Sequence, residues 1–144
     1  MGRLTVNGLD ALSDDFAALA RLPDKVIEGI LEAEADVILP AQRAEIEKQW
    51  NGPKNLSTGM SAKSIKKGKV KKDRDGRSLS IYPQGTRKRG GRTTRNAEIA
   101  FINEYGKRGQ PARPAIDAAN KKKEKEAIDA GERVYNQFLD SRNL

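Results

Sequence analysis

The fold depends on residues 103–116, which read NEYGKRGQPARPAI. Gly106 is suited to a backbone angle that other residues resist. Pro111 and Pro114 hold the residues before them in extended geometry, and a proline is favoured in the first turn of a helix. The segment therefore predicts a tight turn followed by a helix, with Arg113 held beside the start of that helix.

Two roles are open for Arg113. In the first, the Pro-Ala-Arg-Pro sequence only shapes the loop, and we favour this structural role. In the second, Arg113 forms a bidentate pair with a carboxylate of the same subunit or the next one, and Glu104 is the candidate partner. The residues expected to act as structural anchors of this turn are Glu104, Tyr105, Gly106, Pro111, Arg113 and Pro114.

Two helices are expected upstream, near the N-terminus. Apolar residues recur at helical spacing in 8–21, where they are Leu9, Leu12, Phe16 and Leu19. A longer second helix is expected to begin after Pro23 and to run to about Gln49. Since Pro40 interrupts the hydrogen-bond ladder of that helix, we expect a bend near Val37 but not a break. Its apolar stripe is expected to comprise Val26, Ile27, Ile30, Leu31, Ala33, Val37, Ile38, Ala41 and Ile46.

One long helix is expected downstream, over Ala115–Leu139. Its lysine-rich and glutamate-rich stretch at 121–126 interrupts the apolar pattern and is expected to stand clear of the core. The positions expected to face inward are Ile116, Ala119, Ala127, Ile128, Val134, Tyr135, Phe138 and Leu139.

The middle of the chain has β character. Residues 63–83 favour a basic hairpin, because Asp75-Gly76 is suited to a hairpin turn and the segment after it alternates in polarity. Residues 85–95 contain no apolar side chain and are expected to be a flexible basic loop that a partner orders. Residues 97–105 fit either a third strand or a helical turn. The expected fold class is α+β in a single domain, 1–144: two N-terminal helices, a small antiparallel sheet and a long C-terminal helix.

Composition limits both the core and the chemistry. Hydrophobic residues make up 36% of the 144 residues and charged residues 33%, so the core must be small and a subunit that completes itself against neighbours is a reasonable expectation. The absence of Cys and His removes thiolate and imidazole chemistry. The carboxylate pairs Glu45/Glu47 and Glu32/Asp36 are typical of solvated helix faces. We therefore expect no enzyme activity, no cofactor, no metal site and no membrane association.

Charge is distributed unevenly along the chain. Residues 1–50 carry ten acidic and five basic side chains, whereas residues 63–95 carry thirteen basic ones against Asp73 and Asp75. Such separation favours contact with a polyanion or with an acidic partner surface. Docking to a protein, contact with nucleic-acid phosphates and a merely solvated hairpin edge all stay open. The basic residues are Lys63, Lys66, Lys67, Lys69, Lys71, Lys72, Arg74, Arg77, Arg87, Lys88, Arg89, Arg92 and Arg95.

Three short motifs stand in a fixed order along the chain. They are TGMSAKSI at 58–65, EYG at 104–106 and PARP at 111–114. Their order and spacing resemble a family of small siphophage proteins, the minor tail components that are also called tail-completion or neck proteins. The chain departs from that family in having Ala115, instead of a bulky aromatic residue, after the second proline, and in its more basic 85–95 segment.

The resemblance implies a non-enzymatic structural subunit of the phage neck. Such a subunit forms a ring, a hexamer or alternatively a dodecamer, that encloses the DNA channel without sequence specificity. Its partners would be head-closure or connector proteins on one side and tail-terminator or tail-tube proteins on the other. It would assemble in the host cytoplasm and reside in the virion. The alternative is a small nucleic-acid-binding protein that uses the 63–95 region on phosphates.

Overall fold

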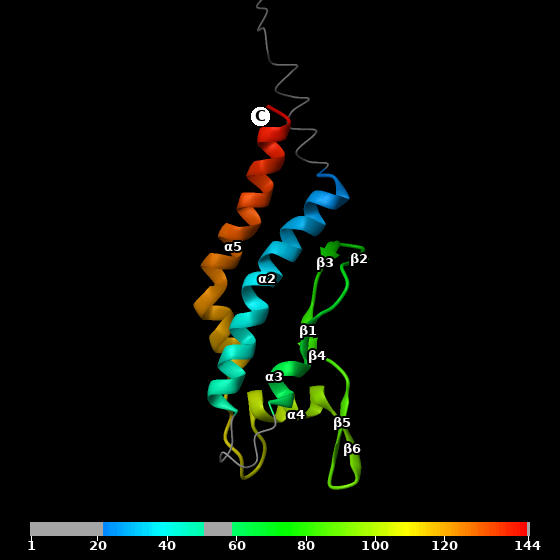
Figure 1. Ribbon diagram of the computed structural model, residues 1–144, viewed down its shortest axis with the longest axis vertical. Coiled ribbons are helices and arrows are strands. Elements are labelled where there is room, and N and C mark those ends of the chain that lie inside the picture. Colours follow the sequence, from blue (N-terminus) through cyan, green and yellow to red (C-terminus); the bar gives the residue numbers. More distant parts are fainter. Residues whose placement is uncertain (1–21, 51–58, 144) are drawn as a thin grey trace, which may run out of the picture.

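The computed structural model of this chain describes residues 22–50 and 59–143, which form an α+β fold (Figure 1). The expected helix at 8–21 lies outside the described residues. Two long helices form the body, and short two-stranded antiparallel sheets lie beside and below it. The helices are α2 (Asp24–Gln49), α3 (Met60–Ser64), α4 (Asn96–Tyr105) and α5 (Ala115–Ser141). The strands are β1 (Ile65–Lys67), β2 (Lys71–Asp73), β3 (Gly76–Ser78), β4 (Ile81–Pro83), β5 (Thr86–Arg89) and β6 (Arg92–Arg95).

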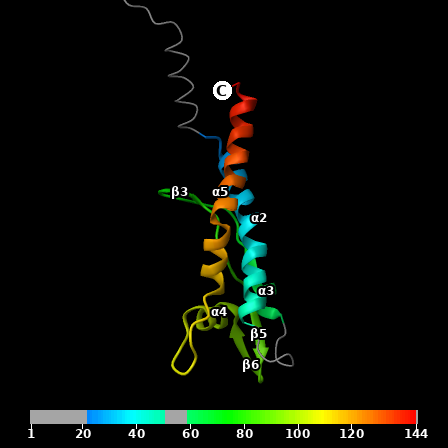
Figure 2. The same ribbon diagram turned by 90° about the vertical axis from the view of Figure 1, so that its left-hand side faces the viewer.

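Helices α2 and α5 pack side by side in antiparallel directions (Figures 1 and 2). Small residues allow their close approach. A Cβ atom added at Gly131 would lie 2.6 Å from Glu34 Oε1 and 3.0 Å from a methyl carbon of Ile30, so a larger residue at this crossing would require the Glu34 side chain to move. The buried positions of α5 are Ala115, Ala119, Ala127, Ala130 and Gly131.

Both long helices match their expected extents closely. Helix α2 is continuous through Pro40, and the bend near Val37 stays a prediction. In α5, Ala119 and Ala127 are buried as expected, but the inward position assigned to Ile128 is wrong, because this side chain is 55% exposed. Of the residues in the apolar stripe expected on α2, only Ile46 is buried. The other buried residues of α2 are Ala35 and Gln42, which lie outside that expected stripe. The helix pair therefore leaves much of its apolar surface half covered.

The core is small and lies where α2 ends. Among the described residues, Ile46 and Ile65 are the large side chains that are fully buried. Trp50, Ala62, Ala100 and Ala115 complete this cluster, with Leu39, Ile81 and Ile116 packed against it. The core thus unites the end of α2, the first strand, α4 and the start of α5.

The basic hairpin at 63–83 forms as one interrupted ladder. Strand β1 pairs with β4 and β2 pairs with β3, both antiparallel, and the chain reverses between Asp73 and Gly76. Gly68 N also donates to Ser80 O at 2.8 Å. Between these pairings the three residues 68–70 face the two residues 79–80, so the register shifts by one residue and the two pairs of strands form separate sheets.

Residues 85–95 correct the expectation of a loop, because they form a second hairpin. Strands β5 and β6 pair with Arg89 opposite Arg92. Gly90 and Gly91, with φ of 59° and 76°, form the two-residue turn. The lack of apolar residues predicts a loop, but the Gly-Gly pair between two polar runs is itself a hairpin signal. The next segment, left open between strand and helix, is the helix α4.

Candidate functional site

Glu104 fixes the start of α5. Glu104 is only 7% exposed. Each of its carboxylate oxygens accepts a hydrogen bond from a backbone N–H in the first turn of α5, where the N–H groups have no partner within the helix. Ile116 N donates to Oε2 at 2.9 Å, and Asp117 N donates to Oε1 at 2.8 Å. The carboxylate acts as an N-terminal cap supplied from another helix, and its negative charge also suits the positive end of the helix dipole.

Arg113 does not pair with Glu104, so that suggested partnership is wrong. Its guanidinium instead donates to Asn103 Oδ1 and, at 3.2 Å, to Gln49 O at the end of α2. Its carbonyl oxygen accepts from Trp50 Nε1 at 2.7 Å, and its backbone N donates to Asn103 O at 2.7 Å. Arg113 therefore ties the end of α2 to α4 and to the start of α5. We call this meeting point, residues 49–50 and 103–117, the joint.

Gly106 ends α4 in a conformation that only glycine adopts readily, with φ 80° and ψ 174°. A Cβ atom there would lie 2.8 Å from Ala112 N and 2.9 Å from Gln110 O. Pro114 directly precedes α5 and is exposed, as is Pro111. Of the six expected anchors, Glu104, Gly106 and Arg113 hold the joint through contacts, and the two prolines shape its backbone.

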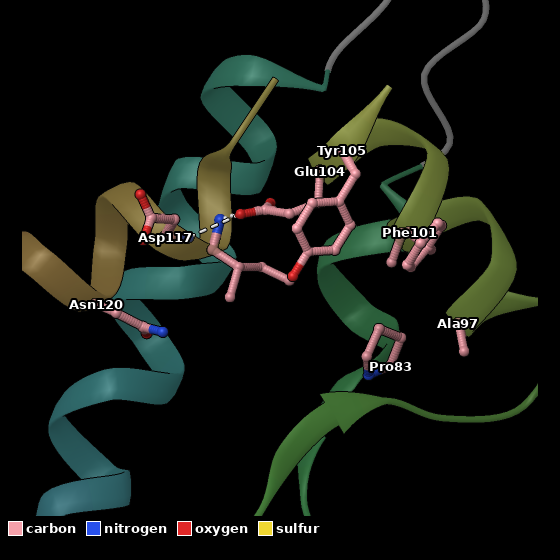
Figure 3. Close-up of a pocket in the computed structure, with 9 residues that line it drawn as sticks. Pro83, Ala97, Phe101, Glu104, Tyr105, Asp117 and Asn120 are labelled. Atoms are coloured by element: carbon pink, nitrogen blue, oxygen red, sulfur yellow. Dashed lines mark hydrogen bonds between the residues drawn. The ribbon is translucent and has the colours of Figure 1, made fainter. Parts of the chain in front are cut away.

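Tyr105 does not anchor the joint by burial, because it is 69% exposed. It contacts Phe101, which is 63% exposed, with ring centroids 4.9 Å apart. Figure 3 shows the two rings on α4 above a groove between α4 and α5. The groove has a volume of about 300 Å³. Its lining residues are Pro83, Ala97, Ala100, Phe101, Glu104, Tyr105, Ile116, Asp117 and Asn120.

The first hairpin is held to α2 by an arrangement that we call the clamp, two cations each held by two carboxylates. Asp24, Glu28, Glu32 and Asp36 recur every fourth residue and so lie along one face of α2. Lys67 Nζ lies 2.6 Å from Glu32 and 2.8 Å from Asp36, whereas Arg77 lies 2.6 Å from Asp24 and 3.1 Å from Glu28. Hydrogen bonds to Asp36 and Glu32 raise the pKa of Lys67. The Glu32/Asp36 pair thus has a structural partner.

Arg87 belongs to the framework of the second hairpin. It donates to Asn96 Oδ1 at 2.8 Å and to Ser61 Oγ at 3.0 Å, and Asn96 in turn donates to Gln84 O at 2.8 Å. Burial and the nearby Arg89 lower the pKa of the guanidinium. Arg87 therefore connects β5 to α3 and to the start of α4.

The other ten basic residues of the 63–95 region are exposed. Within the described ranges, none of these ten side chains forms an ion pair or a hydrogen bond. By position in the chain they fall into two groups, one at the end of α3 and on the first hairpin and one on the second hairpin; Figure 1 shows where these elements lie. The first group is Lys63, Lys66, Lys69, Lys71, Lys72 and Arg74, and the second is Lys88, Arg89, Arg92 and Arg95.

Sequence reasoning missed the neutral partners that complete these contacts. Asn96, Asn103 and the indole of Trp50 are all buried or half-buried hydrogen-bonding groups. An asparagine at each end of a ten-residue helix was the available signal, because asparagine favours positions where backbone groups need a partner. Glu45 accepts a hydrogen bond from Gln49, which lowers its pKa, so this residue too has a local role.

Two kinds of site are not found in the described part of the chain. Residues 22–50 and 59–143 hold no group of three or more side chains suited to a metal ion. In the same ranges, no helix combines the length and the apolar character that crossing a membrane requires.

Comparison of the chain with protein-family models, with curated proteins and with solved structures finds no match. The candidate function must therefore be argued from the joint, the clamp, the groove and the exposed basic residues.

Proposed function

We propose that this protein is a structural subunit of a tailed-phage neck, forming a ring that joins the head connector to the tail around the DNA channel. The support is the order of the three motifs together with what their residues do. Glu104, Gly106 and Arg113, which come from the second and third motifs, hold the joint. Residues of two motifs thus meet in one structural feature, the joint. This supports a relationship to the neck-protein family more strongly than three short matches without a structural connection would.

One observation carries the assembly part of the proposal: the described chain does not complete its own packing. It buries only two large side chains fully, while Phe101, Tyr105 and Ile128 are more than half exposed. A protein of 144 residues ordinarily buries about two thirds of the surface of its unfolded chain. A subunit that leaves aromatic rings exposed and the apolar side chains of its helix pair only half-buried gains the missing burial from neighbouring copies.

The exposed basic residues give this ring its contacts. Ten exposed cations on the two hairpins and at the end of α3, which have no ion pair among the described residues, fit either an acidic connector surface or the phosphates of DNA in the channel. Ring formation and attachment to acidic neighbours use separate parts of the chain, since the apolar groove lies between α4 and α5.

The alternative function is a free nucleic-acid-binding protein that uses the same two hairpins. The ten exposed cations favour it, but stacking aromatics are scarce: Tyr82, 47% exposed, is the aromatic residue on the strands described here. A free binder should bind duplex DNA as a monomer, with an affinity that falls steeply with salt.

Light scattering coupled to gel filtration, followed by negative-stain electron microscopy of the purified full chain, tests the proposal. A closed ring with six-fold or twelve-fold symmetry and weak DNA affinity of the isolated subunit are expected. A chain that stays monomeric at high concentration and binds duplex DNA tightly would contradict the ring and favour the alternative.

A further inference from the structure

The second hairpin, β5–β6, concentrates positive charge on a segment that has no carboxylate. Residues 76–97 contain neither Asp nor Glu. In both views the hairpin lies at the end of the molecule opposite the C-terminus (Figures 1 and 2). The two strands carry five cations, Arg87, Lys88, Arg89, Arg92 and Arg95. An approaching polyanion therefore meets no acidic side chain on this segment.

The register of the two strands gathers three guanidinium groups on one face. Arg89 lies directly opposite Arg92, and Arg87 precedes Arg89 by two residues, so it shares that face. Like charges placed opposite each other destabilise a strand pair. Burial and the charge of Arg89 lower the pKa of Arg87. An anion bound between these groups relieves the repulsion, because the guanidinium fork matches the oxygens of a phosphate or a carboxylate.

The turn of this hairpin leaves its tip uncovered. Gly90 and Gly91 have φ of 59° and 76°, and no atom lies within 4 Å of a Cβ added at either one. A ligand can therefore approach the backbone of the turn closely. Arg89 and Arg92 flank this turn, and the exposed Thr93 adds a hydroxyl group. The tip thus presents groups of the kind that contact phosphate oxygens.

The composition of the hairpin distinguishes between kinds of polyanion. The centre of a protein interface is rich in aromatic side chains and poor in charge, whereas residues 85–95 contain no apolar side chain. Binders of single strands stack bases on aromatic rings, and this segment has none. A two-stranded β-ribbon, in contrast, fits the major groove of duplex DNA. Duplex DNA is therefore the partner that these residues favour.

The first hairpin is a poorer site for phosphates, because carboxylates surround it. Its cations Lys67 and Arg77 are already paired with four carboxylates of α2. Its turn adds Asp73 and Asp75, and the first of these accepts a hydrogen bond from the backbone N–H of the second. A phosphate chain that approached this hairpin would meet all of these acidic groups. The exposed cations of the two hairpins are therefore not equivalent.

We infer that the β5–β6 hairpin binds the phosphate backbone of duplex DNA as a β-ribbon, through Lys88, Arg89, Arg92 and Arg95. These four side chains are exposed and form no ion pair among the described residues. Contacts to phosphates carry no sequence information, so the binding is independent of sequence. The inference rests on the proposed function for the source of the duplex, the DNA in the channel. It assigns that contact to one of the two hairpins and leaves the first hairpin to a protein neighbour.

Fluorescence anisotropy of a short labelled duplex of mixed sequence, titrated with the full chain over a series of salt concentrations, tests this contact. Arg89→Gln/Arg92→Gln removes two phosphate contacts. It should reduce the slope of log K against log salt concentration by about 2 and weaken binding at low salt at least about tenfold. Both side chains are exposed, so the circular dichroism spectrum should stay unchanged.

The matched control removes the same charge from the first hairpin. Lys71→Gln/Arg74→Gln changes two exposed cations of that hairpin and should leave the slope within about 0.5 of the wild-type value. Equal reductions in the two double variants would overturn the assignment to the second hairpin. Wild-type binding to polyglutamate that is as tight, charge for charge, as binding to the duplex would also overturn it, in favour of an acidic protein partner.

The outcomes separate this inference from the proposed function. Rings that form while Arg89→Gln/Arg92→Gln keeps the wild-type slope overturn the DNA contact but leave the neck proposal intact. A monomeric chain whose affinity for the duplex depends on Arg89 and Arg92 supports the DNA contact and contradicts the ring.

Discussion

The joint and the clamp connect the same helix, α2, to the rest of the protein in opposite ways. At the joint, the end of α2 is held by buried, neutral or charge-assisted hydrogen bonds from Arg113 and Trp50. At the clamp, the first part of α2 is held to a hairpin by exposed ion pairs, whose carboxylates are 44% to 66% exposed. Buried hydrogen bonds are costly to break, whereas exposed ion pairs contribute little and weaken with salt.

The joint therefore defines the fold, whereas the clamp leaves the first hairpin free to adapt. The joint is closely packed, because a Cβ atom at Gly106 would lie 2.8 Å from Ala112 N and both carboxylate oxygens of Glu104 accept backbone hydrogen bonds. The clamp holds the hairpin through four surface carboxylates, so the hairpin can yield to a partner at small energetic cost. The proposed ring subunit would use both properties: the joint would set the geometry of the body, and the hairpin would adjust to the neighbouring layer.

The largest expected effect comes from Gly106→Ala at the joint. The new methyl group would meet backbone atoms at 2.8 Å and 2.9 Å, and the φ and ψ values there are nearly restricted to glycine. A loss of roughly 3 kcal/mol or more in the free energy of unfolding is expected, or failure to fold. Gly109→Ala is the control: it has φ 80° as well, but no atom lies within 4 Å, so only about 1 kcal/mol is expected. Equal losses in urea denaturation would contradict a steric role for Gly106.

A second, smaller effect is expected from Glu104→Gln. The amide keeps the shape of the side chain but replaces one of the two accepting oxygens with a donor that faces a backbone N–H. A loss of about 1–2 kcal/mol is expected, typical of a lost helix cap that leaves a buried donor unpaired. Glu132→Gln, exposed in the middle of α5, should leave the unfolding midpoint unchanged. If both variants behave alike, α5 does not depend on this cap.

The sequence predicted the helices better than it predicted the contacts between them. The extents of α2 and α5 follow from periodicity and from the prolines before them, which are local signals. Glu104 and Arg113 both form hydrogen bonds at the joint, but not with each other as the sequence suggests. Two opposite charges nine residues apart suggest an ion pair, whereas the carboxylate is instead used by the backbone of α5, whose position no local pattern reveals.

The middle of the chain was harder to predict for a different reason. The β5–β6 hairpin buries almost nothing, so the alternation of apolar and polar residues that marks a strand is absent. Its order comes from the Gly-Gly turn and from the Arg87–Asn96 contact, which is specific to the folded chain. The sequence does not predict the groove either. Phe101 and Tyr105 belong to a short apolar segment, and nothing in the sequence indicates which way their side chains face.

Removing the clamp cations should affect the hairpin much more than the whole fold. Lys67→Met and Arg77→Met are each expected to lower the free energy of unfolding by less than about 1 kcal/mol, because the carboxylates left behind are exposed to water. Amide hydrogen exchange in the β2–β3 hairpin should accelerate several-fold. Lys66→Met on the same strand has no ion pair and should leave the exchange unchanged, and equal exchange in Lys66→Met and Lys67→Met would contradict the clamp.

The clamp also predicts a pH dependence of defined sign. Since Lys67 has a raised pKa in the folded chain, its contribution to stability is fully present below the ordinary value of 10.5 and is lost as the pH rises through the higher, folded value. The wild-type protein should therefore lose its advantage over Lys67→Met only in strongly alkaline solution. An advantage that disappears near neutral pH would argue against Lys67 as the group responsible.

The smallest effect on the free energy of unfolding is expected from a substitution at Glu34, between α2 and α5. Unlike the changes above, this substitution should stabilise the protein. Burial raises the pKa of Glu34, whose carboxylate lies over Gly131, so the folded chain disfavours the charged form. Glu34→Gln keeps the size of the side chain and removes that charge, and should therefore stabilise the protein at neutral pH, by about 0.5 kcal/mol.

Stability of the wild type rises as the pH falls through the raised pKa and levels off below the ordinary 4.5, where the gap to the variant closes. Urea denaturation at both pH values, with the exposed Glu47→Gln as control, measures this, and a destabilised Glu34→Gln would mean that the charge has a partner that holds the helix pair together.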